Sequence, residues 1–199
     1  MTARSPVCAA AGLGARVLPW LLATALGSAG PPVAAQTVRS TGPSAPSVAP
    51  SPASPCADAH LMERTLQRLN ALRASGLACG GAPHPAAAPL AWSDTLARAA
   101  AGHARDMAQR RQLAHAGSDG STGGDRLQRA GYDWQQWAEN LGLGARSVDE
   151  LMRLWAASPL HCDNLMLPGL QDVGLACVEG SDRRPYWSMT LGTPRGPLR

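Results

Sequence analysis

The order of helical and strand patterns along the chain predicts an α+β domain, in which helices cover a small antiparallel sheet. Three segments combine a capping residue with apolar positions at helical spacing, and a short strand pattern separates the second from the third. Residues 173–178 and 185–191 alternate in polarity around a turn that contains Asp182, which is typical of a hairpin. This order favours one sheet with helices packed against it.

Length and composition suit one domain of this kind. The 199 residues include 45% hydrophobic residues, enough to form a core. The formal charge is only +4, and the arginines that carry all of the basic charge are scattered along the chain. We therefore expect no nucleic-acid partner and no strong attraction to anionic membranes.

Residues 1–35 have the pattern of a secretory signal peptide. Basic residues precede a short apolar run over residues 17–29, and Val-Ala-Ala then offers small residues for cleavage after Ala35. The run is well short of the roughly 20 apolar residues that a membrane span needs, and it contains Pro19. We expect a secreted protein without a transmembrane span, periplasmic or extracellular, that has lost Cys8 with its signal.

Four cysteines remain after cleavage: Cys56, Cys79, Cys162 and Cys177. An even number of cysteines in an exported chain indicates disulfides, and no Cys-x-x-Cys pair favours a metal instead. Three pairings are open. We expect Cys56–Cys79 and Cys162–Cys177, because each pair brackets one local unit and closes a loop of about 15 to 25 residues.

The mature chain divides into a tether and a domain. Residues 36–55 consist mainly of Pro, Ser, Ala and Thr, with almost no charge and no apolar period, and predict a disordered tether. The domain is expected over residues 56–193, with a short tail over residues 194–199.

The first helix is expected to begin at Asp58 as cap and to end near Gly76. Its apolar positions follow one face: Leu61, Leu66, Leu69 and Leu72. Residues 79–85 read as a loop. Ser93 then caps a second helix, and its buried stripe is expected at Leu96, Ala100, His103 and Met107. His103 on that stripe favours a hydrogen-bonded packing role over a ligand role.

Beyond the second helix, Ser121 or Thr122 can cap a short helix that stops at Gly131. The aromatic segment over residues 132–137 favours core packing, although stacked aromatics also suit a sugar or a lipid. A short strand is expected over residues 139–143. Ser147 and Glu150 form a capping box for a third helix, whose buried side includes Trp155. Ser158-Pro159 ends that helix, and residues 161–167 predict one further helical turn.

Three titratable residues mark the candidate site: His115, Glu139 and His161. Each lies in a segment dense in Gly, Ser, Asn or Pro, so the groups are expected on turns held by a helical scaffold. Their spacing matches no metal or catalytic-triad signature by itself. Asn140 is expected to be structural, with its side chain bonded to the backbone of the glycine-rich turn after Glu139.

A series of short motifs occurs in order along the chain. They are Asn70-Ala-Leu-Arg73, Pro89-Leu-Ala-Trp92, Leu96-Ala97, His103-Ala104, Asp106-Met107-Ala108, His115, Glu139-Asn140, Trp155, Ser158-Pro159, His161, Val173-Gly174 and Tyr186-Trp187. This series resembles the CAP superfamily, which includes cysteine-rich secretory proteins, venom antigen 5 and plant pathogenesis-related proteins. The likeness is stronger to its bacterial secreted branch and covers about residues 57–192.

The resemblance implies a three-layer α-β-α sandwich with a central cleft, where two histidines and two glutamates can hold a divalent metal such as zinc. His115 and His161 match the two histidines, and Glu139 matches the first glutamate. The place of the second glutamate holds Ser158, so the tetrad is a triad. Two imidazoles, a carboxylate and a water can still bind Zn²⁺. The alternative is that the three residues form a hydrogen-bonded clamp between loops.

The function predicted first is a non-enzymatic binding module for a lipid, a sterol, a peptide or an envelope component, expected to act as a monomer and to require no cofactor. No nucleophile elbow and no His-Glu-x-x-His motif is present in the sequence. The alternatives are a hydrolase, with Ser118 or Ser158 beside a histidine or with a zinc-bound water, and a structural domain that contacts envelope or host proteins.

Overall fold

The computed structural model describes residues 54–196. The predicted signal peptide, with its cleavage site at Ala35, and nearly all of the predicted tether lie outside these residues. No helix among the described residues is both long enough and apolar enough to cross a membrane.

A four-stranded sheet forms the centre of the domain, in the order β3-β5-β6-β4. Its strands are β3 (Ala91–Trp92), β4 (Trp134–Leu143), β5 (Asp172–Glu179) and β6 (Pro185–Pro194). β4, β5 and β6 are antiparallel neighbours, whereas the two-residue β3 runs parallel to β5. The predicted hairpin is confirmed as β5 and β6. The predicted short strand over residues 139–143 is the second half of the longer β4.

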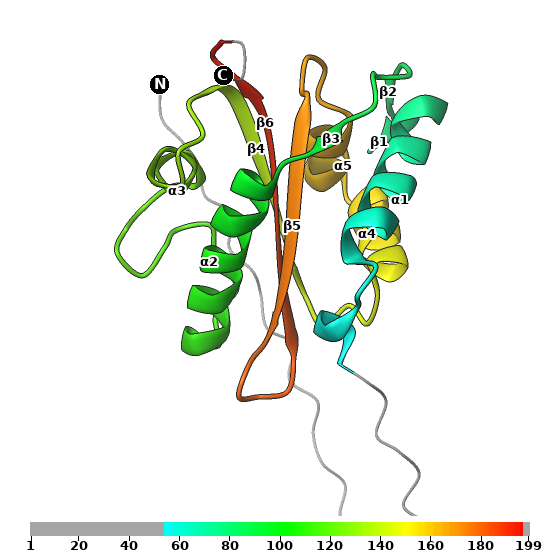
Figure 1. The fold of residues 1–199 in the computed structure, drawn as a ribbon. Helices are drawn as coiled ribbons and strands as arrows, with labels where there is room; N and C mark the ends of the chain where they lie inside the picture. Colours follow the sequence, from blue (N-terminus) through cyan, green and yellow to red (C-terminus); the bar gives the residue numbers. More distant parts are fainter. Residues whose placement is uncertain (1–53, 197–199) are drawn as a thin grey trace, which may run out of the picture. The chain divides into compact units, whose positions relative to one another are not determined.

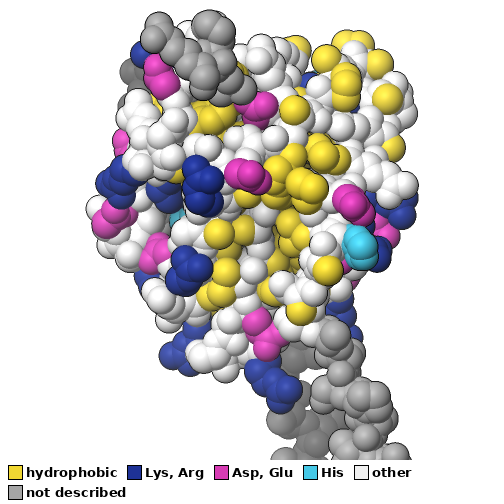
Figure 2. All heavy atoms as spheres, viewed as in Figure 1, with side chains coloured by type: hydrophobic (Ala, Val, Ile, Leu, Met, Phe, Trp, Pro, Cys, Tyr) yellow, Lys and Arg dark blue, Asp and Glu magenta, His cyan; other side chains and the backbone are white. Residues whose placement is uncertain are grey.

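Helices cover both faces of this sheet, so the predicted three-layer α+β sandwich is confirmed (Figure 1). α2 (Asp94–Arg110) lies on one face, packed against β5 and β6, and α3 (Gly123–Arg129) packs beside it against β4. α1 (Leu61–Ser75), α4 (Val148–Ala157) and α5 (Pro159–Met166) form the layer on the other face. The face in Figure 2 shows hydrophobic side chains gathered between α2 and α1, with charged groups around them.

The predicted capping residues start most of these helices. The side chains of Ser93, Thr122 and Ser147 each accept a backbone N–H at the start of α2, α3 and α4. α1 differs, because it begins two residues later than predicted: His60 is its N-cap, and Asp58 accepts the N–H of His60 ahead of the helix. Local side-chain chemistry therefore sets most of the helix starts.

Four clusters of buried hydrophobic residues form the core of the described domain. The largest lies between the sheet and the α1 and α4 layer, and it includes the buried side chains of Trp155 and Trp187. The predicted buried stripe of α2 is confirmed, since its apolar members and His103 are buried. α2 approaches the sheet so closely that a Cβ on Gly174 of β5 would lie 2.7 Å from the Cα of Ala97.

Residues 79–85 were expected to form a loop, and this prediction was wrong. They contribute to a hairpin of β1 (Leu77–Cys79) and β2 (Ala82–His84). Gly80 and Gly81 form its two-residue turn, both with positive φ, which suits the turn of a tight hairpin. The hairpin packs against the start of α5, where Gly80 lies beside Pro159.

The expected disulfide pairing was also wrong. The bonds join Cys56 to Cys177 and Cys79 to Cys162. The local pairing assumed that each bond closes a short loop, but the fold places β1 against α5 and the 3-10 turn η1 (Pro55–Ala57) against β5. The two bonds therefore join parts of the chain separated by 121 and 83 residues, and they fasten the N-terminal elements to the sheet and to α5.

Candidate functional site

A cleft of about 630 Å³ lies along β4, which is the outermost strand of the four-stranded sheet at that side. This volume is typical of small-molecule pockets. Its lining comes from the loop before α3, from β4 and from α5: His115, Ala116, Gly120, Ser121, Thr122, Gly123, Trp134, Trp137, Ala138, Glu139 and Asn164. The cleft thus combines an aromatic wall with a polar end.

Glu139 is the centre of the polar end. Its side chain is 2% exposed, and its carboxylate accepts hydrogen bonds from His115 Nδ1 at 2.9 Å and from Arg126 Nη2 at 2.6 Å. His103 lies behind it, with Nε2 at 3.9 Å from the carboxylate. A buried carboxylate with one guanidinium and two imidazoles around it holds the loop before α3 against β4.

The neighbours of Glu139 determine which groups carry charge. Burial alone would raise the pKa of the Glu139 carboxyl, but the hydrogen bond from His115 and the charge of Arg126 outweigh it and hold that pKa below its ordinary value. The hydrogen bond to Glu139 raises the pKa of His115 above its ordinary value. Burial lowers the pKa of His103, and it favours a neutral ring there.

His103 has the packing role that its place on the α2 stripe predicts. It is 1% exposed, and its Nε2 lies 3.0 Å from the carbonyl oxygen of Ala114. That contact connects α2 to the residue directly before His115. His103 therefore supports the site from behind, and it does not line the cleft.

His161 lies on α5, on the other side of β4 from α2. Its Nδ1 is 2.9 Å from Ser158 Oγ, at the N-terminus of the same helix. Burial, followed by the charge of His115, lowers the pKa of His161. The charge of His115 therefore adds to burial in disfavouring the protonated form of His161. Trp155 packs near the His161 ring, with 6.3 Å between ring centroids, and its Nε1 donates to the Leu141 carbonyl.

Asn140 fastens β4 to α5. It is fully buried, its Nδ2 donates to the His161 carbonyl at 3.0 Å, and its Oδ1 accepts from Asn164 Nδ2 at 2.9 Å. The side chain does bond to backbone, as expected, but its partner is in α5 and not in the glycine-rich turn. Successive strand residues point to opposite faces of the sheet, so the side chain of Glu139 lies on the α2 side and that of Asn140 on the α5 side.

Replacing Asn140 with alanine is expected to lower the free energy of unfolding by about 1 to 3 kcal/mol, because the His161 carbonyl and the Asn164 amide would lose a buried partner. Thermal and urea unfolding measure this effect. Asn70→Ala tests whether any asparagine that bonds to backbone would do the same, since Asn70 exchanges bonds with Leu90 far from the cleft. An Asn140→Ala protein that unfolds like the wild type would contradict the assigned role.

The aromatic wall depends on two glycines of α3. Trp134 and Trp137 pack edge to face with 6.1 Å between ring centroids, and both are partly buried. A Cβ on Gly123 would lie 2.9 Å from Trp137 Cη2, and one on Gly124 would lie 2.9 Å from Trp137 Nε1. The tryptophans therefore contribute to the core under α3 and also present a face to the cleft.

Sequence reasoning missed Arg126, Asn164 and the proximity of His103 to Glu139. Arg126 lies on α3, and its guanidinium forms a 2.6 Å ion pair with Glu139. Its Nη1 and Nη2 also donate to the carbonyls of Ser121 and His115, which fixes the loop that carries His115. Arg126 lies four residues after the helix cap Thr122, and nothing in the sequence around it predicts a contact with Glu139 of β4.

The donor atoms present allow a limited metal site. Both oxygens of Glu139 already accept bonds, one of them from the Arg126 guanidinium, which would repel a cation. Within residues 54–196, the donor atoms of His115, Glu139 and His161 do not gather as a three-ligand group. The Nε2 atoms of the two histidines make no hydrogen bond within the described part of the chain, and they are the donors that a metal could use.

Most of the described domain matches a known protein family. The profile of the cysteine-rich secretory protein family, CAP, matches residues 66–191. The uncharacterized protein YkwD of Bacillus subtilis is 24% identical over 91 residues, which cover 46% of this chain and 35% of YkwD. The chain therefore spans about a third of the length of that curated relative.

Two solved bacterial structures share the fold. An outer surface protein from Borrelia burgdorferi has a TM-score of 0.59 at 18% identity, over 69% of this chain and 95% of that one. An extracellular protein containing an SCP domain from Bacillus anthracis has a TM-score of 0.54 at 23% identity, over 66% of this chain and 39% of that one. At these identities the likeness establishes the fold alone.

Proposed function

The chain belongs to the cysteine-rich secretory protein (CAP) family, and we propose that it is a secreted binding module whose cleft along β4 holds a ligand. The observation that carries this proposal is the pairing of an aromatic wall, Trp134 and Trp137, with a polar end built on Glu139. Such a cleft suits a ligand with an apolar group at one end and hydrogen-bonding groups at the other.

Among the ligands considered, an extended peptide is favoured. β4 is an edge strand, and an edge strand can pair with the backbone of an added chain. A peptide along this edge would place one apolar side chain against the tryptophans, and its backbone near His115 and Asn164. A lipid would contact the same tryptophans but would not pair with the backbone of β4. It is therefore the competing ligand in the test.

The test uses a variant that fills the cleft without touching the core. Ala116 lines the cleft and is exposed, so Ala116→Trp should block it while the fold stays intact. We expect peptides selected from a library to bind the wild type and to bind Ala116→Trp at least about tenfold more weakly, a loss of about 1.4 kcal/mol. Fluorescence anisotropy measures the affinities.

Ala82→Trp is the matched control, because Ala82 is equally exposed on the β1–β2 hairpin and does not line the cleft. It should bind like the wild type. A lipid that co-purifies with the wild type and is absent from Ala116→Trp would show that the ligand of the cleft is a lipid and not a peptide. Equal binding of every ligand by Ala116→Trp and wild type would refute the cleft itself.

We also propose that His115 and His161 can hold Zn²⁺ through their Nε2 atoms, with water completing the site. Glu139 would then orient His115 as an outer carboxylate, which is common for metal-bound histidines. Zinc would supply a Lewis-acidic centre at the polar end of the cleft. Ser158, in place of a second carboxylate, keeps His161 oriented through its 2.9 Å contact but adds no negative charge.

Zinc binding is expected to be reversible and to weaken below about pH 6, because only the neutral imidazole has a free lone pair. Calorimetric titration of wild type and His161→Ala measures it. His161→Ala should lose the binding and remain folded. Binding by His161→Ala equal to that of the wild type would end this proposal.

A hydrolase remains the second candidate, and the Ser158–His161 contact is the observation that favours it. Among the described residues, no carboxylate bonds to His161, whereas a catalytic triad uses one to orient its histidine. Ser118 is a weaker candidate, since its backbone N–H is bonded to Asp106 and its hydroxyl bonds to no histidine in the described part. Ester hydrolysis that disappears in Ser158→Ala would establish the hydrolase.

A further inference from the structure

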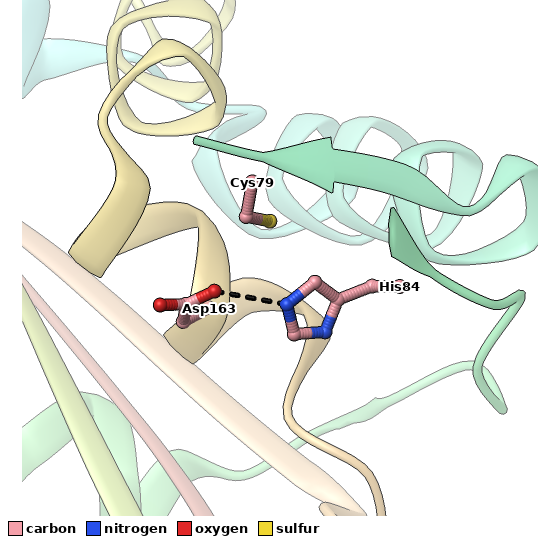
Figure 3. A group of neighbouring side chains, drawn as sticks. All are labelled: Cys79, His84 and Asp163. Carbon is pink, nitrogen blue, oxygen red and sulfur yellow. Dashed lines mark hydrogen bonds and ion pairs between the residues drawn. The ribbon is translucent and has the colours of Figure 1, made fainter. Parts of the chain in front are cut away.

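A second group of metal-ligand side chains lies on the hairpin side of α5 (Figure 3). Cys79 of β1, His84 of β2 and Asp163 of α5 each offer one ligand atom, and these atoms lie within 4.8 Å of one another. His84 Nε2 is 2.9 Å from Asp163 Oδ1. Figure 3 shows the imidazole and the carboxylate pointing toward each other, with the Cys79 sulfur beside them.

The sulfur of this group is not a ligand in the oxidised protein. Cys79 is bonded to Cys162, the residue before Asp163, and a thiolate is the form of cysteine that binds metals. In this state only an imidazole and one carboxylate remain as donors, and they bond to each other. The oxidised group is therefore a link between the hairpin and α5.

We propose that cleavage of the Cys79–Cys162 disulfide converts this link into a zinc site formed by Cys79, His84 and Asp163, with a water as the fourth ligand. A sulfur, a nitrogen and an oxygen donor around one point are a set that Zn²⁺ accepts in tetrahedral geometry. The ion would replace the direct 2.9 Å contact between the imidazole and the carboxylate.

The conversion needs a dithiol reductant, such as the active-site dithiol of a disulfide oxidoreductase. The dithiol gives two electrons and two protons to the Cys79–Cys162 bond. The reductant is thereby oxidised to a disulfide, and Cys79 and Cys162 become thiols. Zinc then binds the Cys79 sulfur and displaces its proton to solvent.

The surroundings of the disulfide allow both steps. The side chains of His84 and Asp163 are 25% and 47% exposed, so an ion can reach them from solvent. Cys79 is only 4% exposed, but it lies on a three-residue strand whose only strand partner in the described part of the chain is β2. Such a small hairpin is a segment that can open locally and expose the disulfide to a reductant. Cys56 and Cys177 are partly exposed, so a dithiol can reduce their bond as well, but neither cysteine belongs to the ligand group.

The test creates the free Cys79 thiol without any reductant. Cys162→Ser leaves Cys79, His84 and Asp163 in place and keeps the Cys56–Cys177 bond. Cys79→Ser is the matched control, since it also breaks the disulfide and leaves one thiol, but it removes the proposed sulfur ligand. Both variants retain His115 and His161, so binding at that pair is equal in the two.

Cobalt(II) and zinc are the probes. We expect Cys162→Ser to bind zinc at least about tenfold more tightly than either Cys79→Ser or the oxidised wild type. Its cobalt complex should show the near-ultraviolet charge-transfer band of a thiolate ligand. His84→Ala and Asp163→Asn, each in the Cys162→Ser background, should lose this gain. Equal zinc affinity in Cys162→Ser and Cys79→Ser, or a cobalt complex without the thiolate band, would overturn the proposal.

A second measurement covers the case in which Cys162→Ser does not fold. Wild type treated with a dithiol, with its fold checked by circular dichroism, should gain zinc binding that His84→Ala lacks under the same treatment. Reduced wild type and reduced His84→Ala that bind zinc equally would overturn the proposal as well. Neither result depends on whether the β4 cleft binds a peptide.

Discussion

Replacing Gly174 with valine is expected to prevent the domain from folding. The backbone of α2 lies directly on this residue of β5: a Cβ there would meet the backbone atoms of Leu96 and Ala97, with 2.7 Å to the Ala97 Cα. Backbone cannot move aside as a flexible side chain can, so α2 would have to leave the sheet. Even Gly174→Ala should cost about 3 kcal/mol or more, at the upper end of overpacking effects.

Circular dichroism and urea unfolding of both variants measure this prediction. The matched control is Gly102→Ala, because Gly102 lies in the middle of α2 itself and an added Cβ there would meet no atom within 4 Å. That change should be neutral or stabilise by up to about 1 kcal/mol, since alanine favours helix over glycine. A Gly174→Ala protein as stable as Gly102→Ala would show that the close approach of α2 is not required.

Replacing Glu139 with alanine is expected to lower the free energy of unfolding by about 3 to 5 kcal/mol, the range measured when one partner of a buried ion pair is removed. The Arg126 side chain is only 11% exposed and would lose the carboxylate that balances its charge. His115 and its loop would lose their link to β4. Glu139→Gln should cost less, because the amide can still accept one hydrogen bond.

Urea unfolding at neutral pH is the measurement for Glu139. Glu179→Ala provides the control, since Glu179 ends β5 and is exposed, so its loss should fall within about 0.5 kcal/mol. If Glu139→Ala loses no more stability than Glu179→Ala, the carboxylate does not hold the site together.

The ion pair of Glu139 and His115 makes the stability of the domain depend on pH, and the pKa shifts of the two groups fix the direction of that dependence. The folded state depresses the pKa of Glu139, so its stabilisation is present above its reference value of 4.5 and is lost as pH falls through the lower folded value. It raises the pKa of His115, so that stabilisation is present below the reference value of 6.5 and is lost as pH rises through the higher folded value. The difference in stability between wild type and His115→Ala should therefore be largest between pH 4.5 and 6.5. A difference that grows above this window would contradict the assigned pair.

His103 acts in the opposite direction in this window. Burial depresses its pKa, so the unfolded chain takes up a proton near the reference value of 6.5 before the folded protein does. Its contribution therefore lowers stability as pH falls below that value. Comparison of wild type with His115→Ala at each pH removes the part that both proteins share.

The fold could be predicted because most of its signals are local. Ser93, Thr122 and Ser147 start helices through bonds to N–H groups within three residues, and Gly76 ends α1 with a positive φ. The alternation over β5 and β6 marks a strand pair without knowledge of anything else. The β1–β2 hairpin has a local turn signal in Gly80-Gly81, but its strands are only three residues long, too short to show an alternating pattern.

The disulfides could not be predicted from local units. Nothing near Cys56 or Cys177 in the sequence shows that the N-terminal turn returns to β5, and 121 residues separate the two cysteines. Spacing favours short loops only when no tertiary contact decides otherwise. Here the packing of η1 on β5 and of β1 on α5 selects the partners.

The sequence by itself determined the α+β class, the starts of α2, α3 and α4, the family resemblance and three candidate site residues, because capping, periodicity and residue type are properties of short segments. Only the tertiary structure decided which partners the site residues contact. It bonds Glu139 to Arg126 and His115, bonds Asn140 of β4 to α5, and brings Cys79, His84 and Asp163 together from three elements. Contacts between segments far apart in the chain depend on how helices pack on the sheet, and no short stretch of sequence contains that information.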